Sequence, residues 1–157
     1  MKSFPRFSAL IAGVALIFAV SGAAIAAEPD QSVTVKAGDT MRFDVTKIEA
    51  VAGTTIAITL ENTGKLPKAA MGHNLVVLTK DANAAKFANA AMMARDAEYI
   101  PAAMTDSIVA HTKLLGPGES DTITFTVPSE PGNYVFLCSF PAHFMAGMRG
   151  TIVVSAP

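Results

Sequence analysis

Residues 121–127 read DTITFTV and residues 133–138 read NYVFLC, and these two stretches decide the fold class. In the first stretch Ile123, Phe125 and Val127 alternate with threonines, which is the two-residue period of a strand with one buried face. Pro131-Gly132 lies between the stretches and is a turn signal. Similar short stretches occupy residues 32–36, 41–46, 55–60, 73–79 and 151–155. Strands at this spacing predict an all-β fold, an antiparallel sandwich or barrel.

One stretch departs from this pattern. Residues 83–95 (NAAKFANAAMMAR) are rich in alanine and contain no β-branched residue, which favours a helix. Phe87 and Ala91 would share one face of that helix, and Asp81 could cap its start. We therefore predict a short helical insertion that lies on the sandwich. Met92-Met93 could offer thioethers to copper, but contact with the core or sheet is the simpler interpretation.

The composition excludes several classes of protein. The chain has 157 residues, of which 51 % are hydrophobic and 16 % charged, so it is too apolar for a disordered chain. Its net charge of −1 provides no basic excess for phosphates, and we expect no nucleic-acid partner. The single cysteine excludes a disulfide within the chain.

The first 26 residues have the three parts of a secretory signal peptide. Lys2 and Arg6 form a positive start, residues 10–20 are uncharged and apolar, and Ala24-Ile25-Ala26 is a cleavage pattern. A membrane anchor is the alternative, but the apolar run is shorter than the ~20 residues that span a bilayer. We predict cleavage near Ala26/Ala27, which leaves residues 27–157 as one exported, periplasmic domain with no stable membrane insertion.

The residues with the most distinctive chemistry lie in one loop near the C-terminus. Residues 138–148 read CSFPAHFMAGM and offer a thiolate, an imidazole and a thioether within eleven residues. Zinc sites prefer more cysteines or paired spacings, which this chain lacks. One Cys, two His and a weak axial Met are typical of a trigonal copper site. His73, at the start of a predicted strand, is the candidate for the second histidine.

Other interpretations of these residues remain open. A lone cysteine is often a small buried hydrophobe, and a Cys–His pair can be a nucleophile with its base, although no orienting Asn or Asp is evident. Met145 competes with Met148 as the axial ligand. Met145 follows His143 by only two residues, and both would have to turn inward within a short span, which favours Met148. His111, in the strand-like residues 108–112, is more typical of a surface position.

Three blocks of the chain resemble the azurin family of small blue copper proteins (cupredoxins). The blocks are residues 66–74, residues 110–119 and residues 138–150. The resemblance implies that residues 27–157 form a Greek-key β-sandwich of about eight strands with a helical flap. It also implies one type 1 copper ion held by His73, Cys138, His143 and Met148, with a possible weak contact from the Gly72 carbonyl.

The ligand loop is closer to that of the auracyanins. Four residues separate His143 from Met148, where the usual azurin loop has three, and Leu75 stands where typical azurins have tryptophan. The family places two backbone N–H donors on the cysteine sulfur, which here would come from Asn74 and Phe140. It also ties the Asn74 side chain to the ligand loop near Ser139.

The function implied is that of a periplasmic electron carrier that cycles between Cu(II) and Cu(I). We expect electrons to pass through an exposed edge of His143 to a redox partner, a cytochrome or copper oxidoreductase. The docking patch would be an apolar rim of Phe140, Pro141, Ala142, Phe144, Met145, Met71 and Leu66, flanked by Lys65, Lys68 and Arg149. The alternative is copper binding or delivery without electron transfer. We do not expect an enzyme, because three histidines without an H-x-H pair are too few for the catalytic copper centres.

Overall fold

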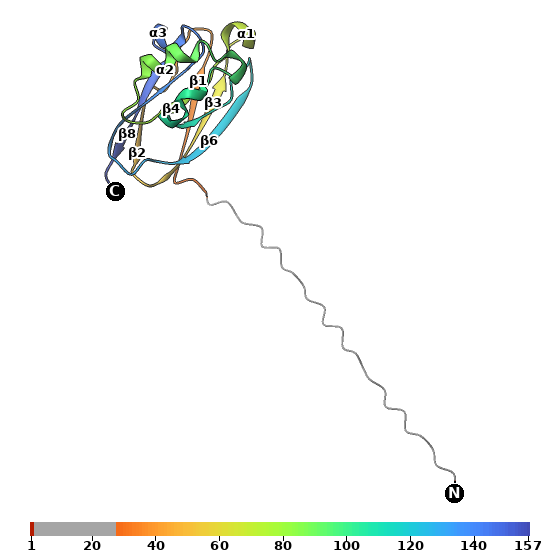
Figure 1. Cartoon of the computed structure of the whole chain (residues 1–157), viewed down its shortest axis with the longest axis vertical. Helices are drawn as coiled ribbons and strands as arrows, with labels where there is room; N and C mark the ends of the chain where they lie inside the picture. Colours follow the sequence, from red (N-terminus) through yellow and green to blue (C-terminus); the bar gives the residue numbers. More distant parts are fainter. Residues whose placement is uncertain (2–27) are drawn as a thin grey trace.

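The structure is a computed structural model that describes Met1 and residues 28–157, so the predicted signal peptide lies outside the described residues. Two β-sheets pack face to face (Figure 1). The smaller sheet has the order β1 (Gln31–Ala37), β3 (Thr55–Asn62), β6 (Ser120–Thr126). The larger sheet has the order β2 (Lys47–Val51), β8 (Arg149–Ser155), β7 (Gly132–Leu137), β4 (Val76–Leu78), β5 (Ile108–His111). This arrangement confirms the predicted all-β sandwich of about eight strands.

The sheets are mixed, whereas the sequence predicted antiparallel ones. β1 pairs with β3 in parallel, and β2 pairs with β8 in parallel, while the remaining pairs are antiparallel. Alternation along a strand reports which face is buried but not the direction of its neighbour, so the sequence pattern could not reveal these parallel pairs.

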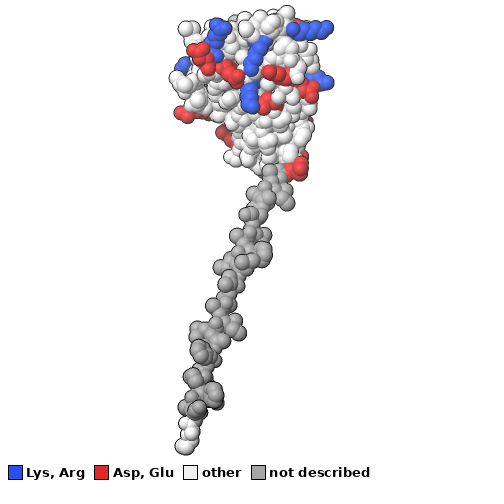
Figure 2. All heavy atoms as spheres, turned by 90° about the vertical axis from the view of Figure 1, so that its right-hand side faces the viewer, with Lys and Arg blue, Asp and Glu red and all other residues white. Residues whose placement is uncertain are grey.

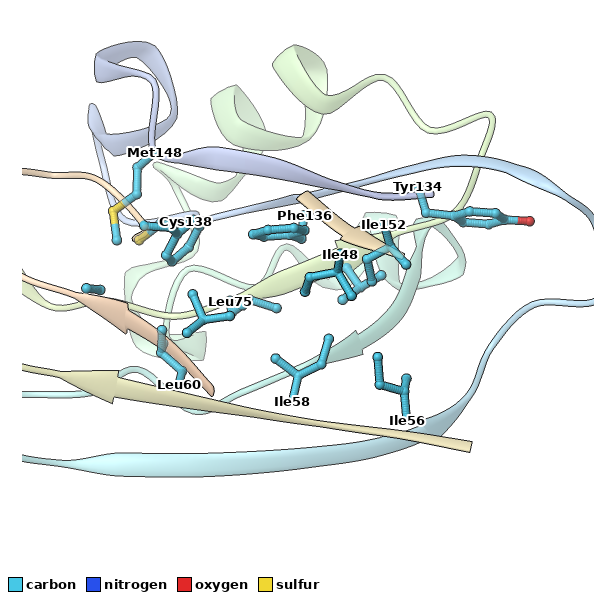
Figure 3. Close-up of a cluster of buried hydrophobic side chains, with 14 of the residues drawn as sticks. Ile48, Ile56, Ile58, Leu60, Leu75, Tyr134, Phe136, Cys138, Met148 and Ile152 are labelled. Carbon is cyan, nitrogen blue, oxygen red and sulfur yellow. The ribbon is translucent and has the colours of Figure 1, made fainter. Parts of the chain in front are cut away.

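The core lies between the two sheets and follows the predicted alternation. Ile56, Ile58 and Leu60 point from β3 into the core and are fully buried. Figure 3 shows these side chains facing those of the larger sheet, among them Phe136 and Ile152. Burying one apolar side chain of this size stabilises the fold by about 1.5–3 kcal/mol. This burial holds the two sheets together and so fixes the positions of the strand ends.

The prediction for the segment before β2 is wrong. Residues 41–46 do not form a strand: Met41 adopts a left-handed backbone (φ 54°), and Phe43 makes only an isolated bridge to Ala37. The strand lies immediately after them, at β2, where Ile48 and Ala50 are buried in alternation. The chain needs the irregular residues to leave β1 and cross to the other sheet.

The helical insertion is present but differs from the prediction at both ends. α2 (Ala84–Ala91) buries Phe87 and Ala91, as predicted, but its cap is Asn83, whose side chain accepts a hydrogen bond from the Lys86 backbone N–H (2.9 Å). Two 3₁₀ helices follow, η1 (Arg95–Ala97) and η2 (Ala102–Ser107). The predicted contact of Met92 and Met93 with the core or sheet is wrong, because these side chains are 48 % and 90 % exposed. None of the helices in the described residues has the length and apolar character that a bilayer crossing requires.

The remaining two helices lie at the end of the sandwich opposite the C-terminus (Figure 1). α1 (Lys68–Met71) precedes β4, and α3 (His143–Ala146) lies between β7 and β8. The start of β4, the end of β7 and the start of β8 therefore meet at this end. The predicted ligand loop and His73 are connected to these three strand ends.

Candidate metal centre

Three buried side chains meet where those strands end. Each of His73, Cys138 and His143 offers one ligand atom, and these atoms lie within 4.8 Å of one another. The Cys138 Sγ lies 3.4 Å from His143 Nδ1, and the two imidazole ring centroids are 4.9 Å apart. The structure therefore brings His73 together with Cys138 and His143, which lie 65 or more residues later in the sequence.

The ligand loop is shaped by its own backbone. The Cys138 N–H donates to the Met148 carbonyl (3.1 Å), which closes the loop at its base. The Met148 N–H donates to the His143 carbonyl (2.9 Å), and α3 fills the span between them. Left-handed residues Ala142 (φ 69°) and Gly147 (φ 96°) begin and end that helical turn. The tight turn directs His143 and Met148 inward from the same loop.

The two candidate thioethers lie in different environments. Met148 is fully buried, whereas Met145 is 76 % exposed. In Figure 3 the Met148 side chain extends toward the same end of the core as the Cys138 thiol. Burial therefore favours Met148 over Met145 as the thioether that a metal at this site would meet.

His73 is held by a backbone bridge to Leu115. Its N–H donates to the Leu115 carbonyl (3.1 Å), and its carbonyl accepts from the Leu115 N–H (2.7 Å). Gly72 is buried before it, where a Cβ would come within 2.7 Å of the Lys68 carbonyl oxygen. Only glycine fits beside that carbonyl, and this close packing fixes the backbone that presents His73.

The His73 ring provides a test of whether a metal fits. Both of its nitrogens are buried and have no hydrogen-bond partner among the described residues. Buried polar atoms in proteins are nearly always satisfied, so an unsatisfied imidazole next to a thiol and a second imidazole indicates a missing partner. A metal ion that takes thiolate and imidazole ligands would satisfy the His73 ring, and copper and zinc are the ions with that preference.

Burial keeps all three groups in their uncharged forms. It raises the pKa of Cys138 to about 12, while the backbone N–H groups of Asn74 and Phe140 oppose this shift by stabilising the thiolate. It lowers the pKa of His143 to about 4, and the neighbouring His73 adds to that effect. Burial also lowers the pKa of His73; the Gly38 carbonyl and the Asp39 carboxylate oppose this shift, although neither forms a hydrogen bond with the ring. Neutral imidazoles are ready to bind a cation, and a bound cation would displace the thiol proton.

A hydrogen-bond network fastens the two ligand segments together. The Asn74 Oδ1 accepts from the Ser139 N–H, and its Nδ2 donates to the Ser139 Oγ, both at 2.8 Å. The Nδ2 also donates to the Glu98 carbonyl (3.2 Å). The predicted tie between Asn74 and the loop near Ser139 is confirmed. Glu98 was not predicted from the sequence. It lies 24 residues from Asn74, and no sequence motif indicated its left-handed backbone (φ 53°) or its contact with Asn74.

The apolar rim differs from the prediction. His143 is only 2 % exposed, so the expected exposed edge is almost entirely covered. Phe140 and Phe144 are also buried, and Phe140 packs between Tyr99, which it meets edge-on, and His143, with centroid distances of 4.9 and 4.7 Å. Leu66 and Met145 are the large apolar side chains of the predicted rim that are exposed. Large aromatic rings next to the metal site gain more from burial than from solvent contact, which explains the difference.

His111 lies on β5 and is exposed, as predicted. Its Nδ1 lies 3.0 Å from the Thr112 carbonyl, and it is not among the clustered metal-binding side chains. The position of the Gly72 carbonyl relative to a metal stays a prediction.

The sequence was next compared with known proteins. A model of a family described as "copper binding proteins, plastocyanin/azurin family" matches residues 29–155. The chain belongs to this family. The azurin of Bordetella pertussis is 41 % identical over 93 % of this chain and 97 % of its own length. The azurin of Alcaligenes faecalis is 40 % identical over 76 % of this chain and 94 % of its own.

A solved auracyanin has the same fold as this plastocyanin/azurin protein. The dithionite-reduced auracyanin of the photosynthetic bacterium Roseiflexus castenholzii superposes with a TM-score of 0.71 at 38 % identity, covering 79 % of this chain and 96 % of that one. The resemblance predicted from the sequence is thereby confirmed. Membership of a copper-binding family selects copper as the metal, in agreement with the buried Cys, His and His donors.

Proposed function

We propose that this chain is a periplasmic type 1 (blue) copper protein that carries single electrons between redox partners. His73, Cys138, His143 and Met148 hold one copper ion, and the Gly72 carbonyl is a possible weak fifth contact. The observation that carries the proposal is the meeting of three buried ligand atoms within 4.8 Å, with both His73 nitrogens left without a partner. Copper supplies the one-electron step between Cu(II) and Cu(I).

The surrounding residues keep the site dry and rigid. His73, Cys138 and Met148 are fully buried, so water is excluded from the ligand atoms. The ties from Asn74 to Ser139 and from Cys138 to Met148 hold the ligand segments in one arrangement. Because the ligand geometry changes little between the two oxidation states, the protein needs little rearrangement to gain or lose an electron. The backbone N–H groups of Asn74 and Phe140 stabilise the thiolate and so tune the potential.

Electrons enter and leave near α3, where His143 comes closest to solvent. The exposed apolar side chains Leu66 and Met145 provide a small contact surface for a partner such as a cytochrome or copper oxidoreductase. Small, weak contacts of this kind allow quick release after each transfer. Export to the periplasm would follow from the predicted signal peptide of residues 1–26. A carrier of this kind transforms no substrate of its own, so we propose no enzymatic activity.

The proposal is tested by voltammetry of the copper-loaded protein. We expect one reversible electron per chain and rapid electron self-exchange between oxidised and reduced protein. A protein that binds copper, shows slow self-exchange and passes its copper readily to an acceptor would contradict the electron carrier and favour copper delivery.

A further inference from the structure

Two guanidinium groups lie against the ligand loop. A Cβ on Gly147 would lie 3.4 Å from the Arg42 Cζ, so Arg42 covers the C-terminal end of α3. The Arg149 Cζ lies 5.0 Å from the centroid of the Phe144 ring, over the same helical turn. Arg42 precedes β2 and Arg149 begins β8, so two separate segments place a cation on the loop of the metal site.

Neither cation is neutralised by a nearby acid in the part of the chain that the structure describes. Ion pairs involve Lys36, Lys47, Lys68 and Lys80, but neither of the two arginines. Arg42 lines a hollow of about 550 Å³ together with Asp39 and Asp44, but no carboxylate oxygen of the described residues lies within 4.0 Å of its guanidinium nitrogens. Both carboxylates accept backbone N–H groups, Asp39 from Lys65 and Leu66 and Asp44 from Lys36. Residues 138–148 contain no acidic residue.

This local charge opposes the charge of the molecule. Lys2 and Arg6 are the only charged residues before residue 28, so residues 28–157 carry a net charge of −3. In Figure 2 the Lys and Arg side chains on this face gather in the half of the domain away from the grey segment, whereas Asp and Glu extend further toward it. The basic side chains visible on this face therefore lie in the half of the domain that holds the metal site, with acidic side chains among them.

We propose that Arg42 and Arg149 dock an acidic surface of the redox-protein partner over α3. The inference rests on the proposed electron-carrier function and adds the chemical character of the partner. Carboxylates of the partner would pair with the two guanidinium groups, which suit bidentate contacts, while the exposed Met145 fills the apolar centre. One electron then passes from the reduced protein to the oxidised partner, or in the reverse direction, with no bond made or broken.

The test uses the mature, copper-loaded, reduced protein with two small oxidants of opposite charge. Anionic hexacyanoferrate(III) and cationic tris-phenanthroline cobalt(III) each accept one electron, and their rate constants are measured between about 10 and 200 mM ionic strength, a range over which screening of exposed charges changes strongly. We expect the hexacyanoferrate rate to fall several-fold with added salt, although net charge predicts the opposite. The double variant R42Q/R149Q should lose that dependence.

Lys80→Gln is the matched control, because it removes one cation at the far end of β7, where Lys80 pairs with Glu130 and the Pro131 carbonyl. It should leave the salt dependence unchanged. A glutamate-rich peptide, titrated into the reduced, copper-loaded protein and followed by NMR, should shift resonances of residues 142–149 in wild type but not in the double variant.

Three results would overturn the inference. They are a hexacyanoferrate rate that rises with salt in wild type, a double variant that keeps the wild-type dependence, and a peptide that binds elsewhere or equally to the variant. A reduced protein that donates no electron to either reagent would instead overturn the proposed function. The reduction potential of each variant, measured alongside, separates lost docking from a changed driving force.

Discussion

At the scale of single residues, the distinction between the two thioethers is the most direct consequence of burial. Met148 is fully buried beside Cys138, and Met145 is 76 % exposed. We expect Met148→Leu to keep copper and raise the reduction potential, because loss of a weak donor removes stabilisation of the oxidised ion. Met145→Leu is the matched control and should leave the potential unchanged. Voltammetry of both variants measures this, and the opposite ranking would assign Met145 as the axial ligand.

Asn74 is the residue whose loss should most weaken the connection between the ligand segments. Asn74→Ala removes the partners of the buried Ser139 N–H and Oγ, and an unsatisfied buried group costs about 1–3 kcal/mol. We expect a loss of that size in the free energy of unfolding of the copper-free protein, measured with urea. Asn133→Ala, at an exposed position of β7, should change it by less than about 0.5 kcal/mol. Equal losses in both variants would contradict the assigned role.

The candidate ligands could be predicted from the sequence because their chemistry is distinctive. A Cys, a His and two Met within one loop, with few other histidines in the chain, left a small set of choices. Supporting residues could not be predicted in this way. Glu98 and Arg42 reach the site from remote segments, and only the fold shows that they do.

At the scale of elements, the register of β7 and β8 depends on Gly150. Gly150 pairs with Phe136, and a Cβ there would collide with the Phe136 ring and lie 2.6 Å from the Thr46 carbonyl oxygen. We expect Gly150→Ala to lower the free energy of unfolding by roughly 1–3 kcal/mol, the usual cost of overpacking. Thermal and urea unfolding of the copper-free protein measure the loss.

A double variant tests the cause of that loss. Adding Phe136→Leu to Gly150→Ala shortens the colliding side chain, so part of the cost should be recovered relative to the sum of the two single variants. Strict additivity would show that the ring is not the obstacle.

Strand alternation predicted the elements well where one face is buried against the other sheet, as in β3. It failed at residues 41–46 because their role is to change sheets, and the left-handed Met41 allows that crossing. Apolar character also misled at Met92-Met93, which lie beyond the end of α2 and not on its buried face. A hydrophobic residue favours burial, but its position relative to the end of the helix determines whether it can reach the core.

At the scale of the whole molecule, the buried histidines link stability to pH. The pKa of His143 is lowered to about 4, and that of His73 is also lowered, while an unfolded histidine titrates near 6.5. Between these values the unfolded chain binds more protons, so the copper-free protein should lose stability as the pH falls from about 6.5 to 4. Urea unfolding at a series of pH values measures this. His143→Gln should weaken the dependence.

We propose that one copper ion is held at the end of the sandwich through the Cys138 thiolate. The most direct measurement is the optical and paramagnetic-resonance spectrum of the copper-loaded mature protein and of Cys138→Ala. We expect one copper per chain and an intense blue, thiolate-to-copper absorption in the wild type that is absent from the variant. A blue, copper-bound Cys138→Ala protein, or a colourless wild type with copper bound, would contradict the account.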